Sequence, residues 1–399
     1  MKTFSILLAL IFLSVFGFSQ NNWTKINPSG LENYKIEILE NSDEGMIIKL
    51  NVNSYRFDEV ETPNGTEIIV RSPNCPNIYE KGAPDLPFIT TSIVVPNIGG
   101  FDYSIVSSGY ILINNISIAP SKGTIYRNID PKTVPYEYGP GYQINEFFPF
   151  GNCSMTDPFI IRDVRGSNLK FYPFTYNAIN KELKVYTEII VKIKFTDDHF
   201  INEIASTKNS KNDEFNTIYN KLFCNYESTT KYTPVEEGNP GTMLIIAADE
   251  YADAMNDYIT WKHEKGIQTE LVLMSEIGTT AAQVESYIQN YFDTENLSYV
   301  LLVGDADDVP TMTISGNDSD NGYVYLAGDD GYADALIGRF SGNSVADIET
   351  QVLRTINYEK ELTTTDTWLE NAFGTASNEG EGQGHDGGES DVTHLNNIR

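Results

Sequence analysis

The stretch TMLIIAADEYADAMNDYITWKHEKGIQTELVL, residues 242–273, decides the fold of the C-terminal part of the chain. Its first seven residues form a continuous apolar run, which is typical of a strand buried on both faces. Apolar residues at helical spacing follow from Tyr251 to Ile259, and Gly266 marks the end of that helix. A second apolar run comes next. A strand, an amphipathic helix and another strand in this order predict an open α/β sheet.

The same alternation continues along the rest of the chain. Apolar spacing predicts a helix over 284–292, with Thr279 or Thr280 as its N-cap, and another over 345–356 behind Ser344. The further predicted strands are SYVLLVGD (298–305), YVYLAG (323–328), ALIGRF (335–340) and WLENAFGTAS (368–377).

Acidic residues follow two of these predicted strands, where an open α/β sheet holds its ligands. Asp305 ends one strand, and Glu379 comes just after another. Asp305, Asp307 and Asp308 together would either hold a cation or cap a turn.

The loop GDDGYAD, residues 328–334, has the composition of a calcium-binding loop. Asp330 and Asp334 offer carboxylates, and Tyr332 lies among the intervening carbonyl groups. Calcium favours flexible loops of this kind, with six to eight oxygen ligands. The spacing is not that of an EF-hand. Because acidic turns with glycine are common, an ordinary surface turn is the alternative.

Residues 34–200 have the pattern of β structure. Short runs rich in Ile, Val, Tyr and Phe recur, and Asn64-Gly65 between two of them is a favoured hairpin turn. No helical periodicity of any length interrupts these runs. The sequence therefore predicts an antiparallel sandwich or barrel, followed by a polar linker over about 200–231.

The chain begins with the cation Lys2 and an apolar stretch that ends at Phe18. This stretch is shorter than the roughly 20 apolar residues that span a bilayer, so it predicts a signal peptide cut near Ser19–Gln20 rather than an anchor. No other segment is apolar enough to span a membrane. We therefore expect a soluble, exported protein, either secreted or at the cell surface.

Charge divides the chain unevenly. Residues 1–231 carry 21 Lys and Arg against 25 Asp and Glu, whereas residues 232–399 carry 6 against 31. An acidic field of this size argues against nucleic acid as a partner, and it favours calcium or the basic side chains of other proteins.

The motif content leaves the function open. The three cysteines, Cys75, Cys153 and Cys224, are too few and too uneven in number for a disulfide framework. The four histidines show no zinc spacing, and no GxSxG, GxGxxG or P-loop motif occurs.

Several longer blocks, in matching order and spacing, resemble the gingipains, which are secreted cysteine endopeptidases that cleave after arginine or lysine. These blocks are KYTPVEEG (231–238), YVLLVGDADDVP (299–310), GDDGYADALIGRFS (328–341), QVLRTINYEKELTTTDTWL (351–369) and ASNEGEGQGHDGGESDVTH (376–394). Two upstream blocks are similar to the propeptide of the same family: KGAPDLPFITTSIVVP (81–96) and GTIYRNIDPKTVPYEYG (123–139).

The resemblance implies a multidomain precursor. A signal peptide at 1–19 and a β-rich, sandwich-like propeptide at 20–231 would precede the N-terminal part of a peptidase domain at 232–399. Lys231–Tyr232 would be the processing bond, where the family often has arginine instead of lysine. The peptidase domain is expected to have an incomplete caspase-like α/β/α fold.

The resemblance also implies a structural calcium ion. The loop that holds Asp330, Tyr332 and Asp334 is similar to a calcium site of the family. Asp305 and Asp308 lie where a further calcium site is expected.

The resemblance implies a catalytic role for one acid near the end of the chain and a substrate-binding role for another. Glu379 aligns with an acid that assists the catalytic histidine, and Asp391 aligns with the acid at the base of the S1 pocket in arginine-specific members. A carboxylate there would bind a guanidinium in a bidentate pair. Without the family pattern, both acids would be read as parts of an ordinary acidic loop. Arg127 is the candidate propeptide residue that would occupy S1 and inhibit the enzyme.

The catalytic histidine and cysteine of the family lie downstream of this segment, and no cysteine follows Cys224. We therefore expect the chain as given to be the inactive front portion of a peptidase precursor, truncated before both residues. The full enzyme would cleave proteins after basic residues, arginine more than lysine, with its own propeptide as inhibitor. The alternative is a non-enzymatic exported protein, in which the same domain is a calcium-stabilised binding or adhesion module.

Overall fold

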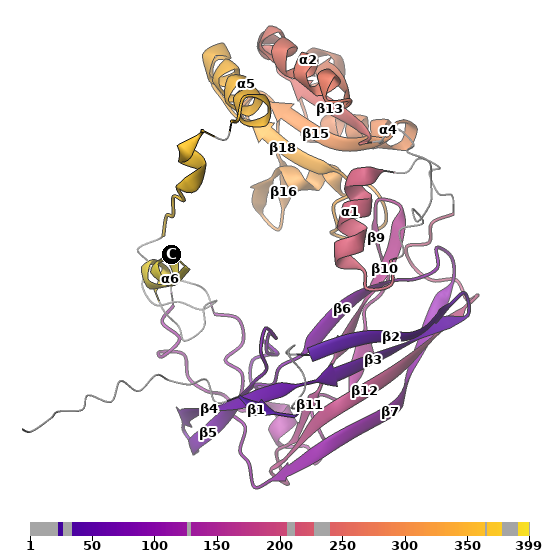
Figure 1. Ribbon diagram of the computed structural model, residues 1–399, viewed down its shortest axis with the longest axis vertical. Coiled ribbons are helices and arrows are strands. Elements are labelled where there is room, and N and C mark those ends of the chain that lie inside the picture. The colour runs from indigo at the N-terminus through magenta and orange to yellow at the C-terminus, as the bar shows by residue number, and fades with distance from the viewer. Residues whose placement is uncertain are drawn as a thin grey trace, which may run out of the picture.

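The computed structural model describes residues 23–26, 34–125, 129–205, 212–226, 240–363, 365–376 and 390–398. A β-rich N-terminal part and a C-terminal part with helices packed on a sheet are evident (Figure 1). This division agrees with the predicted multidomain architecture. The signal peptide predicted at 1–19 lies outside the described residues. Among those that are described, no helix combines the length and the apolar character needed to cross a membrane.

The strands of the N-terminal part form three sheets, and all of their pairs are antiparallel. The first sheet contains β2 (Tyr34–Ser42), β3 (Gly45–Val52), β7 (Gly100–Asn114), β11 (Phe174–Asn177) and β12 (Glu182–Thr196). The second contains β6 (Ile89–Val94), β8 (Cys153–Met155), β9 (Phe159–Ile161) and β10 (Val164–Phe171). The third contains β1 (Thr24–Lys25), β4 (Ser54–Thr62) and β5 (Gly65–Arg71), and a 3-10 helix, η1, covers Pro140–Tyr142.

The two larger sheets share one apolar core. Ile48 and Leu50 of β3 and Val191 of β12 are buried in the same cluster as Ile93 of β6 and Leu169 of β10. Alternate residues of β3 face this core, as the period of two in a half-buried strand requires. The predicted antiparallel, sandwich-like architecture is therefore confirmed for the described residues.

Two turns of the N-terminal part depend on glycine. Gly45 has φ +150°, and a Cβ atom there would lie 2.2 Å from the carbonyl oxygen of Ile193. The predicted hairpin forms, but its two-residue loop is Pro63-Asn64 and not Asn64-Gly65, because Thr62 pairs with Gly65, the first residue of β5. Gly65 has φ +100°, a conformation that other residues rarely adopt.

The C-terminal part is built on a four-stranded parallel sheet with the strand order β14-β13-β15-β18. The strands are β13 (Thr242–Ala247), β14 (Gln268–Leu273), β15 (Leu297–Val303) and β18 (Leu336–Phe340), and β16 (Met312–Ile314) with β17 (Asn317–Ser319) forms a separate hairpin. The helices are α2 (Asn256–Glu264), α3 (Met274–Ile277), α4 (Ala281–Thr294), α5 (Val345–Lys360) and α6 (Asp391–Ile398), with the 3-10 helices η2 (Asp249–Tyr251), η3 (Asp253–Met255), η4 (Asp320–Val324) and η5 (Thr367–Glu370).

Helices cover both faces of this sheet. Ile245 of β13 lies in one buried cluster with Tyr258 of α2 and Ile348 of α5. Leu244, the preceding residue, lies in a second cluster with Ile288 of α4. Since successive residues of a strand face opposite sides, α2 and α5 form one layer and α4 forms the other. The parallel, helix-covered sheet predicted from residues 242–273 is confirmed.

The helix ends follow local sequence signals. Thr280 caps α4 and forms a capping box with Gln283. The Ser344 side chain accepts a hydrogen bond from the N–H of Asp347 at the start of α5. Gly266, with φ +81°, follows the end of α2.

Two predicted strands are wrong. YVYLAG (323–328) begins in the 3-10 helix η4, where the Tyr323 hydroxyl donates to Pro310 O at 2.6 Å. The N–H groups of Leu326 and Ala327 donate to the Asp334 carboxylate. These N–H groups are therefore not available to a strand ladder. In WLENAFGTAS (368–377), Trp368 lies in η5, and no described strand pairs with the residues after it.

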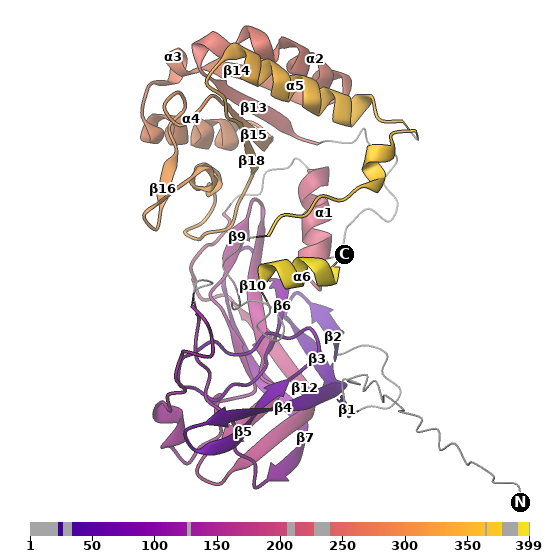
Figure 2. The same cartoon turned by 90° about the vertical axis from the view of Figure 1, so that its left-hand side faces the viewer.

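Part of the predicted linker is a helix. Helix α1 (Asp213–Leu222) lies within the segment 200–231, and its side chains Phe215 and Tyr219 are buried. Both views place α1 and the tip of the β9–β10 hairpin between the two parts of the molecule (Figures 1 and 2). Hydrophobic residues spaced four apart in a short polar segment were the signal for this helix.

Candidate functional site

The loop after β15 is the first of the predicted acidic sites. The carboxylate of Asp308 accepts hydrogen bonds from the N–H of Asp305 at 3.1 Å and from the Tyr251 hydroxyl at 3.4 Å. The carboxylate of Asp305 accepts from the N–H of Ala306 at 2.8 Å and from the Ser341 hydroxyl at 3.2 Å. These hydrogen bonds cap the turn, and a cation at Asp305 and Asp308 stays a prediction.

Arg339 of β18 fixes this loop from the side. Its guanidinium forms a bidentate pair with Asp320 at 2.7 and 2.9 Å. The remaining donors reach the carbonyl oxygens of Gly304, Asp305 and Val309 at 3.0, 3.2 and 2.8 Å. Sequence reasoning missed Arg339, although an arginine inside an apolar strand of a strongly acidic segment was an available signal.

The loop 328–334 is the second predicted acidic site, and Asp334 is its buried member. Asp334 is 0% exposed. One carboxylate oxygen accepts the N–H groups of Leu326 and Ala327, both at 2.7 Å, and the other accepts the N–H of Arg162 at 2.5 Å. Burial raises the pKa of the Asp334 carboxyl to about 6, although these three N–H groups act in the opposite direction.

Asp330 makes a similar contact with Ile160 of the N-terminal part, two positions before Arg162. Its carboxylate accepts the N–H of Ile160 at 2.8 Å and the N–H of Tyr332 at 3.0 Å. The ring of Tyr332 stacks on Phe159, with ring centroids 4.1 Å apart, and its hydroxyl accepts from the amide of Asn168 at 3.2 Å.

These contacts involve the same carboxylates that are expected to bind a calcium ion. A calcium ion needs carboxylate oxygens that are free to coordinate it. The carboxylates of Asp330 and Asp334 accept hydrogen bonds from N–H groups, two of which belong to residues 160 and 162, and each carboxylate keeps at least one further lone pair. Among the described residues, no three His, Cys, Asp or Glu side chains form a group that could hold a metal ion. A calcium ion at this loop stays a prediction.

Of the remaining predicted site residues, the structure describes only Asp391. Asp391 is the first residue of α6 and is partly buried. Glu379, Arg127, Lys231 and Tyr232 lie outside the described residues. The expected pairing of Glu379 with Asp391, and of Arg127 with either, stays a prediction.

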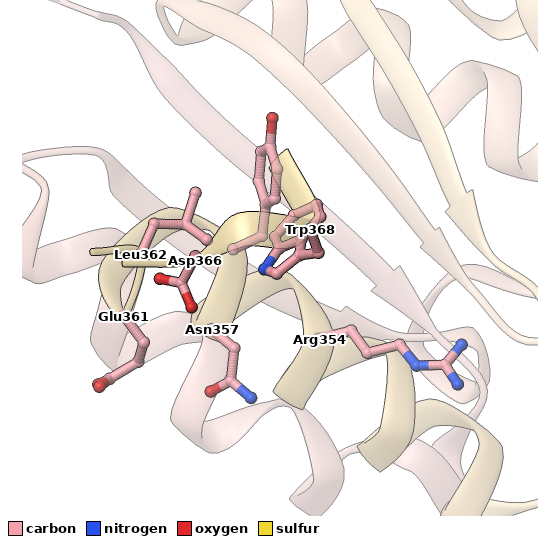
Figure 3. A pocket seen from close by; sticks show the side chains of 7 residues that line it. Arg354, Asn357, Glu361, Leu362, Asp366 and Trp368 are labelled. Carbon is pink, nitrogen blue, oxygen red and sulfur yellow. The ribbon is translucent and has the colours of Figure 1, made fainter. Parts of the chain in front are cut away.

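A hollow lies between the C-terminal half of α5 and η5, away from all of these acids. It has a volume of about 590 Å³, and its lining includes Tyr358 and Trp368, whose ring centroids are 6.2 Å apart (Figure 3). Both rings are more than half exposed. None of the predicted site residues lines it.

Comparison with known proteins gives a consistent result. The family model Propeptide_C25 matches residues 29–233, and that of peptidase family C25 matches residues 236–398. The chain is 38% identical to gingipain R1 of Porphyromonas gingivalis over 402 residues, which cover 100% of this chain and 40% of that protein. It is 24% identical to Lys-gingipain HG66 of the same organism over 391 residues, which cover 94% of this chain and 22% of that protein. The chain thus spans less than half the length of these relatives.

A solved structure is also similar to part of the chain. It is the complex of the Porphyromonas gingivalis RgpB pro- and mature domains, which is 35% identical in sequence and matches with a TM-score of 0.46. The match covers 49% of this chain and 100% of that chain.

Proposed function

The chain belongs to the gingipain family, peptidase family C25, and we propose that it is the N-terminal portion of the precursor of a secreted cysteine endopeptidase. The proposed enzyme cleaves proteins after basic residues, with arginine preferred over lysine. The preference for arginine is supported by the identity of 38% with gingipain R1, against 24% with Lys-gingipain HG66.

One observation carries this proposal: the two family matches coincide with the two parts of the molecule. The propeptide match ends at residue 233 and the peptidase match begins at residue 236, between α1 and β13. The two parts then contact each other through β9 and the loop 328–334. A propeptide bound to its peptidase is expected to show this arrangement. The four-stranded sheet would belong to a caspase-like α/β/α domain.

The proposed chemistry is attack of a thiolate on the peptide carbonyl, with a histidine as general acid and base. Residues 232–399 contain no cysteine, so we propose that residues 1–399 alone have no peptidase activity. Asp391 would bind the guanidinium of the substrate arginine, and Glu379 would assist the histidine. The excess of 31 acidic over 6 basic residues in this region supports attraction of cationic substrates.

The propeptide would keep the enzyme latent until it is removed. Arg127 is the proposed inhibitory residue, and Lys231–Tyr232 is the proposed processing bond. A structural calcium ion is proposed at Asp330, Tyr332 and Asp334, and a further calcium site at Asp305 and Asp308. Secretion, or exposure at the cell surface, would follow from the signal peptide at 1–19.

The full-length protein tests this proposal. After processing and removal of the propeptide, it should hydrolyse peptides that carry arginine before the scissile bond. Alkylation with iodoacetamide should abolish that activity, because the nucleophile is a thiolate. Hydrolysis that survives complete alkylation would contradict a cysteine peptidase. The absence of any hydrolysis in the processed protein would contradict the proposal as a whole.

A further inference from the structure

Arg162 occupies a turn that normally favours glycine. It is the first residue of the two-residue loop between β9 and β10, where Ile161 pairs with Val164. Its φ is +56°, and the N–H of Asp163 donates to Ile161 O at 2.7 Å across it. A side chain in this left-handed conformation strains the backbone. The presence of arginine, not glycine, at this turn indicates that the side chain itself is needed.

The Arg162 side chain extends from the N-terminal part into the C-terminal part. Although Arg162 is at the tip of a hairpin, it is only 6% exposed. Its guanidinium donates to the main-chain oxygens of Leu297 and Asp334 and to the side-chain oxygen of Asn296. All three acceptors belong to the C-terminal part.

Aromatic rings from both parts flank the same guanidinium. Its central carbon lies 5.1 Å from the ring centroid of Phe215 in α1 and 5.6 Å from that of Phe292 in α4. Cations at this distance are attracted to aromatic rings, more strongly when water is excluded. Arg162 therefore links a helix of each part through one buried group.

The backbone of the hairpin is bound as well. One edge of β9 pairs with β10, and the N–H groups of Ile160 and Arg162 point away from that edge. Asp330 and Asp334 accept these two N–H groups at 2.8 and 2.5 Å. The two carboxylates thus take the place of a neighbouring strand along the free edge of β9.

This contact lies away from the expected substrate cleft. Leu297 is the first residue of β15, and the loop 328–334 leads into the start of β18. Both are at the amino ends of parallel strands, whereas ligands of such sheets bind beyond the carboxyl ends, where Asp305 lies. The contact at the amino ends of the strands is therefore separate from the cleft expected at their carboxyl ends.

We propose that the amino-end edge of this sheet is a docking site for the propeptide, with the Arg162 hairpin as the anchor that holds the two parts together once their connection is cut. Asn296, Leu297, Asp330 and Asp334 form the receiving surface. The proposal rests on the proposed function, in which residues 20–231 are the propeptide. It adds a binding surface that is separate from the cleft, so that occupancy of the cleft and attachment of the propeptide depend on different residues.

The test uses the complete 399-residue chain with a viral protease site inserted between Lys231 and Tyr232. After cleavage, the dissociation rate of the two parts is measured by size-exclusion chromatography and by biolayer interferometry. The unchanged pair should stay together, and Arg162→Ala should dissociate at least 100-fold faster. Arg162→Lys keeps the charge but lacks the planar fork, so it should dissociate at least tenfold faster even if the alanine variant does not fold.

Arg165 provides the matched control. It is also buried, and the acceptors that its guanidinium has among the described residues are the carbonyl oxygens of Pro96, Gly99 and Ile201, all on the propeptide side. Arg165→Lys should therefore change the dissociation rate less than twofold. The anchor is refuted if Arg162→Lys and Arg165→Lys have the same effect, or if both Arg162 variants dissociate at the unchanged rate.

These measurements need no peptidase activity. A failure of the anchor would leave the proposed cysteine peptidase untouched, and a failure to hydrolyse peptides would leave the anchor untouched.

Discussion

The backbone N–H of Arg162 lies 2.5 Å from a carboxylate oxygen of Asp334, a residue 172 positions further along the chain. This contact gives a buried acid a hydrogen-bond donor from the other part of the molecule. It also joins the two parts of the molecule that the family matches separate.

Replacing Asp334 by alanine should destabilise the chain. Three N–H groups, from Leu326, Ala327 and Arg162, would lose their acceptor in a fully buried place. We expect a loss of about 2–5 kcal/mol in the free energy of unfolding, measured with urea. Asp329→Ala is the control, because that side chain is exposed; its loss should stay below about 0.5 kcal/mol. Equal losses in the two variants would contradict the described role of Asp334.

Replacing Arg339 by methionine should loosen the loop 304–309. The change removes the donors to three carbonyl oxygens and the partner of Asp320, at a cost of about 3–5 kcal/mol. Hydrogen–deuterium exchange in peptides that cover this loop should be at least tenfold faster, while exchange in α4 stays unchanged. Arg354→Met, on the exposed face of α5, should have no such effect. Unaltered exchange in the loop would show that Arg339 does not hold it.

The ion pairs that Glu359 of α5 forms with Lys262 of α2 and with Lys265 should stabilise the folded chain in a pH-dependent way. Burial would raise the pKa of Glu359, but hydrogen bonds from Lys262, Lys265 and Trp261 outweigh it and lower the pKa from 4.5 to about 2. A lowered pKa in the folded state contributes stability above pH 4.5, and this contribution is lost as the pH falls towards 2.

Glu359→Gln isolates that contribution. It should cost about 1–3 kcal/mol in unfolding free energy at pH 6, and the difference from the unchanged chain should shrink between pH 4.5 and 2. Urea unfolding at several pH values measures this difference. Glu361→Gln, an exposed neighbour, should show no trend. A difference that grows as the pH falls would have the wrong sign for this account.

Two glycine substitutions test the packing of the N-terminal part. Gly45→Ala would place a Cβ atom 2.2 Å from the carbonyl oxygen of Ile193, so β3 and β12 would have to separate. We expect a loss of about 3 kcal/mol, seen in thermal unfolding. Gly65→Ala meets nothing within 4 Å and should cost only the strain of its φ of +100°, about 1 kcal/mol. Similar losses would show that the close approach of β3 to β12 is misplaced.

The sequence was sufficient for most of the helix-covered sheet. Residues 242–273 carry apolar runs and helical spacing that depend only on local periodicity, and the structure agrees with both. YVYLAG failed because a short apolar run does not distinguish a strand from a buried 3-10 turn. The turn is stabilised over a strand because Asp334, eight and seven positions further on, accepts the N–H groups of Leu326 and Ala327.

The candidate site was predicted less well, for a physical reason. The acids at 330 and 334 were found by composition, but their partners are 170 and 172 positions away, and such contacts leave no local pattern. The left-handed φ of Arg162 cannot be read from residue types either. The roles of Glu379 and Asp391 came from the family resemblance, and they stay predictions.

The specificity of the processed full-length enzyme tests the central claim most directly. Two peptides should be compared that differ only in the residue before the scissile bond, arginine in one and its uncharged isostere citrulline in the other. If Asp391 binds the guanidinium, Asp391→Asn should lower kcat/KM for the arginine peptide by about 100-fold or more and leave the citrulline peptide nearly unchanged. Equal kcat/KM values for the two peptides in the unchanged enzyme, or an arginine preference that persists in Asp391→Asn, would contradict the account.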